Sequence, residues 1–111
     1  MAAHEAVIVS TARTPIGTAF KGSLADVDAL ELGTLAVAEA VARAGIDPAL
    51  VDDVILGESL YGGGDIARYA AIEAGLVNAP GIAQNRHCAS GLSAVQNATA
   101  LVLEVPAPAA G

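Results

Sequence analysis

The sequence predicts an α/β fold in which a parallel sheet carries helices on its faces. Short apolar stretches alternate along the chain with segments of helical periodicity. The first apolar stretch is a continuous β-branched run, which is typical of a parallel strand covered on both faces. Capping residues flank the helical segments. The expected order of elements is β-α-β-α-β-α, with no internal repeat.

Composition and charge restrict the possible partners. The 111 residues correspond to one small domain, and with 54% hydrophobic but only 3% aromatic residues the core should consist largely of Ala, Val, Leu and Ile. Twelve acidic against 5 basic residues give a net charge of −7, which argues against nucleic acid or an anionic membrane as partner. No apolar run is long enough to span a bilayer, and the N-terminus does not resemble a secretory signal. The single cysteine cannot form an internal disulfide, so we expect a reducing cytoplasm.

The first expected strand and helix occupy the N-terminal half. Ala6–Thr11 is predicted to be a buried strand that ends at Arg13–Gly17, and a loop with Phe20 and Gly22 follows. A helix is predicted from Asp28 to Ala44, where Asp28 and Glu31 suit a capping box and Gly45 a C-terminal stop. Its apolar stripe contains Leu30, Val37, Val41 and Ala44, with Gly33 beside it. Asp47-Pro48 suits the start of one further helical turn.

The remaining elements follow the same alternation. In order, we expect a strand at Asp53–Gly57, a loop at Gly62–Gly64, a helix at Ile66–Ala74 stopped by Gly75, a turn at Asn78–Gly81, a strand at Ile82–His87 and a helix at Ala89–Leu103. In the last helix Leu92, Val95 and Val102 are expected to face inward, and Pro106 to end the element. We expect residues 1–100 to form the domain and residues 101–111 a Pro/Ala-rich tail that is disordered or a linker.

Cys88 is the best candidate for a reactive group. It lies at the carboxyl end of the third expected strand, where active sites of parallel sheets form, and directly before a helix. A helix N-terminus presents free N–H groups and partial positive charge, which favour a thiolate. By spacing alone, a lone cysteine is more often a buried small hydrophobe. His87 is a poor base for it, because neighbouring side chains usually point in opposite directions.

For the other polar and Gly-rich candidates the sequence favours structural roles. Asn85 suits a role in fixing the turn ahead of Cys88, and Ser90 suits a partner for a free N–H at the helix start. Gly62–Gly64 lacks the Lys-Ser/Thr of a phosphate-binding loop, so we expect a connection there. Arg13 and Lys21 are expected to be solvated.

Several motifs in the right order resemble the N-terminal part of thiolases. The matching pieces are Arg13-Thr14-Pro15-Ile16-Gly17, Phe20–Leu24, Ile46–Pro48, Val51–Gly57, Ala67-Arg68, Ala74–Leu76 and, most specifically, Asn85–Val95 around Cys88. The resemblance extends to about Ala98. It implies a thiolase-like fold of which this chain carries an incomplete part of the first half. Ketoacyl synthases, which also use a cysteine at this place, fit these motifs less well.

The resemblance implies acyl transfer between CoA thioesters through an acyl group bound to Cys88. No separate cofactor is expected, because CoA thioesters are the substrates, used either in thiolytic cleavage of 3-ketoacyl-CoA or in condensation of acetyl-CoA. It also implies a homo-oligomer, a dimer or tetramer. The family's activating histidine, oxyanion-hole histidine and second cysteine lie in later regions. The alternative is therefore an inactive fragment or assembly segment, and we expect the tail to reflect a truncated or frame-shifted reading frame.

Overall fold

The computed structural model describes residues 5–61 and 63–104. Its elements are three α-helices, α1 (Ala29–Ala44), α2 (Ile66–Glu73) and α3 (Ser90–Glu104), one short helical turn, η1 (Pro48–Leu50), and two strands, β1 (Ile55–Gly57) and β2 (Ile82–Gln84). Residues 105–111, which hold most of the expected tail, lie outside the described residues, and α3 continues through residues 101–104. No helix among the described residues is long and apolar enough to cross a membrane.

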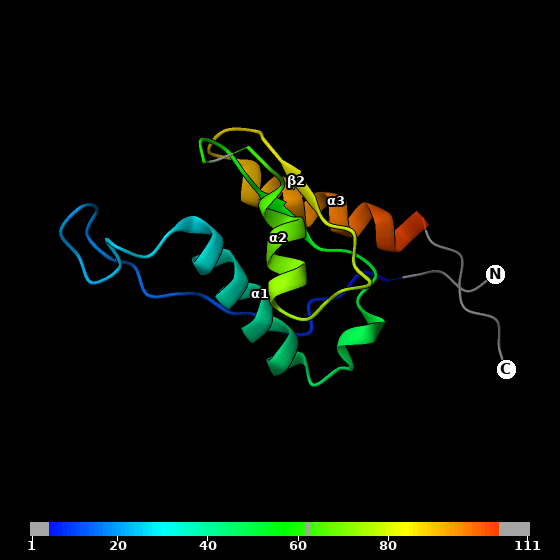
Figure 1. Cartoon of the computed structure of the whole chain (residues 1–111). Coiled ribbons are helices and arrows are strands. Elements are labelled where there is room, and N and C mark those ends of the chain that lie inside the picture. The colour runs from blue at the N-terminus through cyan, green and yellow to red at the C-terminus, as the bar shows by residue number, and fades with distance from the viewer. Residues whose placement is uncertain (1–4, 62, 105–111) are drawn as a thin grey trace, which may run out of the picture.

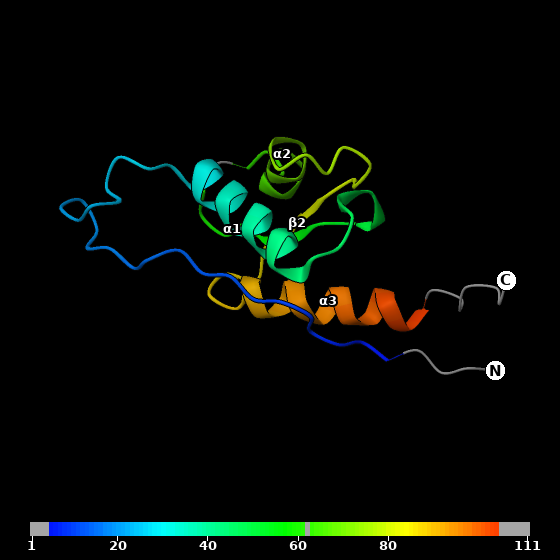
Figure 2. The ribbon, with the colours of Figure 1, turned by 90° about the horizontal axis from the view of Figure 1, so that it is seen from below.

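The sheet lies between two helical layers. Figure 2 shows α1 and α2 on one side of the strands and α3 on the other. The two strands pair in parallel, with Ile55 opposite Ile82 and Gly57 opposite Gln84. The expected parallel pairing is therefore confirmed, although both strands are shorter than the apolar patterns that predicted them.

Local capping explains where α1 begins and ends. The Asp28 carboxylate accepts a hydrogen bond from the Glu31 N–H at 2.8 Å, and Gly45 adopts the left-handed conformation (φ 67°) that stops the helix. Asp47 caps η1 in the same way, accepting from the Ala49 N–H at 3.0 Å. The predicted N-cap at Asp28, the stop at Gly45 and the further helical turn are confirmed. The capping box is only half formed, because among the described residues no hydrogen bond joins the Asp28 N–H to the Glu31 side chain.

The core sits between the sheet and the α1–α2 layer. Its buried residues are Val54, Ala67, Ala71, Leu76 and Ala79, and Val37 and Val41 of the predicted stripe pack against them. Gly33 faces the Ile66 side chain, and a Cβ added there would lie 3.4 Å from its end, at the edge of ordinary van der Waals contact. The small size of these side chains agrees with the composition.

The prediction of a first strand at Ala6–Thr11 is wrong in this structure. The segment is extended but pairs with no strand among the described residues, and Val7, Ile8 and Val9 are 69–78% exposed. It is attached instead to α1, because Ser10 Oγ donates to the Ala40 carbonyl (2.6 Å) and Arg43 donates to the Thr11 carbonyl (3.1 Å). Figure 1 shows that the chain after this segment runs out into a loop that projects beyond the N-terminal end of α1. A β-branched run forms a strand only where a neighbouring edge offers hydrogen bonds.

The predicted inward face of α3 is also wrong. Leu92, Val95 and Val102 are 68%, 53% and 44% exposed, while the buried residues are Ser90, Ser93 and Ala94. Close approach to β1 selects this small face, because a Cβ on Gly57 would lie only 2.8 Å from atoms of Ser90 and Gly91. Large side chains cannot occupy that contact.

Candidate functional site

The site is a short turn between β2 and α3. After β2 ends at Gln84, the chain turns through residues 85–89 and enters α3 at Ser90. The Ala89 and Ser90 N–H groups donate back to the Arg86 and His87 carbonyls at 3.0 and 3.1 Å. His87 adopts a left-handed conformation (φ 50°), which is uncommon for a residue with a side chain. The turn thus presents Cys88 two residues before the first residue of the helix.

Asn85 fixes the first half of this turn. Its Oδ1 accepts a hydrogen bond from the His87 N–H at 2.8 Å, and its Nδ2 donates to the Ser59 carbonyl at 3.2 Å. The expected turn-fixing role of Asn85 is therefore confirmed. The bond to Ser59 adds a tie to the segment after β1 that local sequence did not predict.

Ser90 fixes the second half. Its side chain is buried, its Oγ accepts from the Arg86 N–H at 2.8 Å, and the same hydroxyl donates to the His87 carbonyl at 2.6 Å. Ser90 was expected to satisfy a free N–H at the helix start, but the N–H that it accepts belongs to Arg86 in the turn before the helix. The two side chains therefore restrain the backbone on either side of Cys88.

Cys88 itself is exposed and free. This excludes the plainer reading of a buried small hydrophobe. The neighbouring His87 is exposed too, and in the part of the chain that the structure describes no hydrogen bond links its imidazole to the Cys88 sulfur. The position before α3 agrees with the sequence expectation, and the nucleophilic role remains a prediction.

The remaining polar candidates are accounted for by local contacts. Arg13 donates to the carbonyl of its neighbour Thr14 at 3.1 Å, and Lys21 is exposed. In the Gly-rich connection the Gly64 N–H donates to the Glu58 carboxylate at 3.1 Å. That backbone group therefore binds a side chain of the protein itself. Among the described residues no group of three or more His, Cys, Asp or Glu could hold a metal ion.

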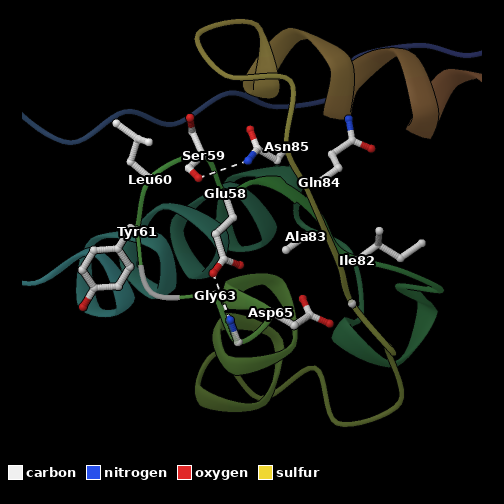
Figure 3. Close-up of a pocket in the computed structure, with 12 residues that line it drawn as sticks. Glu58, Ser59, Leu60, Tyr61, Gly63, Asp65, Ile82, Ala83, Gln84 and Asn85 are labelled. Carbon is white, nitrogen blue, oxygen red and sulfur yellow. Dashed lines mark hydrogen bonds between the residues drawn. The ribbon is translucent and has the colours of Figure 1, made fainter.

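A pocket next to the turn was not foreseen from the sequence. It has a volume of about 690 Å³. Residues of the segment between β1 and α2 and the whole of β2 line it, among them Glu58, Tyr61, Asp65 and Asn85. Figure 3 shows the Glu58 side chain directed toward the loop at Gly63, and Asn85 directed toward Ser59. Asn85 thus belongs both to the wall of this pocket and to the Cys88 turn.

Two charged residues of the pocket, Glu58 and Asp65, act at the start of α2, where the Asp65 carboxylate accepts the Arg68 N–H at 3.2 Å. The Glu58 carboxylate accepts the Ile66 N–H at 2.9 Å as well as the Gly64 N–H. The hydrogen bond from Ile66 chiefly lowers the pKa of Glu58 below its ordinary value, partial burial opposes this, and the bonds from Gly64 and Gly63 add to it. The carboxylate is therefore engaged at the start of α2. A carboxylate held in this way is a weak candidate for a general base.

Comparisons with known proteins agree with this fold. The family model described as "Thiolase, N-terminal domain" matches residues 6–105. An acetyl-CoA acetyltransferase of Cupriavidus necator is 44% identical over 102 residues, covering 89% of this chain and 26% of the relative, and a 3-ketoacyl-CoA thiolase of Bacillus subtilis is 43% identical over 103 residues with the same coverage. The crystal structure of the Bacillus anthracis acetyl-CoA acetyltransferase superposes with a TM-score of 0.85 at 37% identity, covering 92% of this chain and 26% of that one.

These matches confirm the predicted thiolase-like α/β fold, present in part. The chain spans about a quarter of the length of the relatives it matches. The match to the family model runs across the Cys88 turn and the elements on either side of it. The chain therefore belongs to the thiolase family and corresponds to sequence of its N-terminal domain.

Proposed function

We propose that this chain takes part in acyl transfer between CoA thioesters, with Cys88 as the group that accepts the acyl chain. The single observation that carries the proposal is the exposed thiol of Cys88 on a restrained turn directly before α3. Membership of the thiolase family supports it, because matched relatives are named as acetyl-CoA acetyltransferase and 3-ketoacyl-CoA thiolase.

The proposed first step forms one thioester and breaks another. The Cys88 sulfur attacks the carbonyl carbon of an acyl-CoA, the carbon–sulfur bond to CoA breaks, and the CoA thiolate leaves and takes up the proton lost by Cys88. Exchange between two thioesters costs little free energy, so a cysteine is a suitable carrier. In the second step free CoA or the carbanion of acetyl-CoA removes the acyl group.

In the proposed role Cys88 is the nucleophile, and among the described residues no imidazole is hydrogen-bonded to its sulfur. We therefore propose that this chain alone performs the first step slowly and does not turn over as an enzyme. General-base catalysis typically contributes about 10²–10⁴-fold to a rate. We therefore expect the first step to be slower by about this factor than in an enzyme with a positioned base. Association with further copies of the chain, and a reducing cytoplasm that would keep the thiol free, are part of the same proposal.

Acetylation of the whole chain by acetyl-CoA tests this proposal. We expect peptide mass spectrometry to find one acetyl group on the peptide that contains Cys88, and none after Cys88→Ala. Added CoA should remove the group. Acetylation should be faster in the folded chain than in urea, where the same thiol reacts without a restrained turn. Equal rates in both states, or acetyl groups at Lys21 instead, would exclude the proposal.

The second candidate function is assembly with another polypeptide, without catalytic activity of the chain itself. The observation that favours it is the exposed apolar surface on the N-terminal segment, residues 5–28, and on α3, which includes Ile8, Phe20, Leu92 and Val95. Large exposed apolar patches mark surfaces that another polypeptide covers. Acetyl trapping at Cys88 separates the two candidates, since only the first predicts it.

A further inference from the structure

Asn85 joins the Cys88 turn to a part of the chain that is distant in sequence. Its amide nitrogen donates to the Ser59 carbonyl, 26 residues away, while its amide oxygen accepts the His87 N–H. Because Ser59 lies two residues after the end of β1, movement of the turn away from the sheet breaks this bridge. Asn85 is itself exposed, so its two hydrogen bonds, and not burial, give it this role.

Ser90 joins the same turn to the start of α3 from the opposite side. Its buried hydroxyl bonds the backbone of both Arg86 and His87, and its Cβ lies against the place where Gly57 approaches α3. The backbone before Cys88 is thus tied through Asn85 to the end of β1 and through Ser90 to the first turn of α3. His87, the residue between these ties, keeps its left-handed conformation only where the surroundings hold it.

We propose that Asn85 and Ser90 are positioning residues, which hold the Cys88 sulfur in the orientation that acyl transfer requires. This inference rests on the proposed function of Cys88. Attack on a thioester carbonyl requires alignment of the sulfur with the carbonyl carbon, and a shift of about 1 Å can cost about 10²-fold in rate. Alkylation by a small reagent such as iodoacetamide approaches an exposed sulfur from many directions. Loss of positioning should therefore slow acylation much more than alkylation.

Two substitutions and two matched controls test the inference in the whole chain. Asn85→Ala removes the bridge to Ser59, and Ser90→Ala removes both hydroxyl bonds. Asn78→Ala changes an exposed turn asparagine outside the site, and Ser93→Ala changes another buried serine of α3. For each variant the rate of Cys88 acetylation by acetyl-CoA is compared with the rate of alkylation by iodoacetamide, and hydrogen exchange reports the His87 amide.

We expect Asn85→Ala and Ser90→Ala to slow acetylation by about tenfold or more. Alkylation should stay close to wild type, and the His87 amide should exchange faster. Both controls should leave the three readings unchanged. If Ser90→Ala fails to fold, the exposed Asn85 decides the matter alone.

The outcomes separate this inference from the proposed function. If wild-type Cys88 is acetylated but Asn85→Ala reacts equally fast, the inference is wrong and the proposed function stands. The inference is also wrong if acetylation and alkylation fall together, because that result indicates a general loss of structure. If wild-type Cys88 is not acetylated at all, the proposed function itself fails and the inference fails with it.

Discussion

Gly57 and Ser90 are in such close contact that a Cβ added to Gly57 would lie 2.8 Å from the Cβ of Ser90. Real Cβ atoms do not approach this closely, and the Gly91 nitrogen lies at the same distance. Two neighbouring groups of the Cys88 turn, a serine side chain and the first turn of α3, therefore rest directly on the end of β1. Any side chain at position 57 moves the helix that follows Cys88.

Gly57→Ala should accordingly destabilise the chain. The added methyl meets backbone as well as the Ser90 side chain, so it cannot be relieved by a rotamer change, and overpacking of this kind costs about 1–3 kcal/mol. Gly91→Ala is the matched control, because a Cβ there meets nothing within 4 Å and alanine favours the helix by about 0.5–1 kcal/mol. Urea unfolding followed by circular dichroism compares them. A loss of stability as large at position 91 as at position 57 would contradict the contact described here.

Gly81 and Gly75 provide a second matched pair. Both have a positive φ, 93° and 86°, so alanine is strained at each by about 1–2 kcal/mol. Only Gly81 also faces a steric limit, since its Cβ would lie 2.6 Å from the Arg68 nitrogen, whereas nothing lies within 4 Å at Gly75. Gly81→Ala should therefore cost at least about 1 kcal/mol more than Gly75→Ala in the unfolding free energy. Equal costs would mean that backbone conformation alone determines both, and that α2 does not pack on the loop before β2.

The helices were predictable from the sequence to within one residue at almost every end, because their signals are local. Asp28 and Gly45 act on backbone groups at most three residues away, so nothing distant is needed to recognise them. The strands were less predictable. A strand at Ala6–Thr11 requires a partner edge, and the sequence pattern of the segment contains no information about where that edge lies.

The candidate site, too, was predictable only where its features depend on neighbouring residues. The exposed turn at Cys88 and the local roles of Asn85 and Ser90 follow from neighbouring residues. The bond from Asn85 to Ser59 and the pocket beside it depend on chain segments brought together by the fold, and they were not foreseen. The exposed face of α3 was missed for a similar reason. An apolar stripe predicts burial, but the close approach of Gly57 determines which side of the helix meets the sheet.

Glu58 should make stability depend on acid pH. Its pKa is lowered in the folded chain, chiefly by the hydrogen bond from Ile66, so the folded state binds this proton more weakly than the unfolded state, for which the ordinary value is 4.5. The stabilisation is complete above that value and is lost as the pH falls through the lowered pKa. Glu58→Gln should therefore unfold more easily by about 1 kcal/mol at about pH 7, the usual effect of weakening a helix-capping acceptor, and the difference from wild type should shrink below about pH 4.

The matched control for this prediction is Glu73→Gln. Glu73 is an exposed acidic residue at the other end of α2, so its substitution changes the net charge by the same amount without touching the capping interaction. Unfolding free energies measured at several pH values compare the three chains. If Glu73→Gln reproduces the pH profile of Glu58→Gln, the acid dependence arises from overall charge and not from the bonds to Ile66 and Gly64.

Ile8 distinguishes the observed N-terminal segment from the strand that its sequence suggests. Because Ile8 is 78% exposed, Ile8→Thr should change the unfolding free energy by no more than about 0.5 kcal/mol and should raise solubility by removing exposed apolar surface. Leu76→Ala, at a core position only 2% exposed, should cost about 2–5 kcal/mol in the same measurement. A cost for Ile8→Thr that approaches that of Leu76→Ala would place Ala6–Thr11 in a buried sheet, as its β-branched pattern predicts, and would overturn the extended, exposed segment described here.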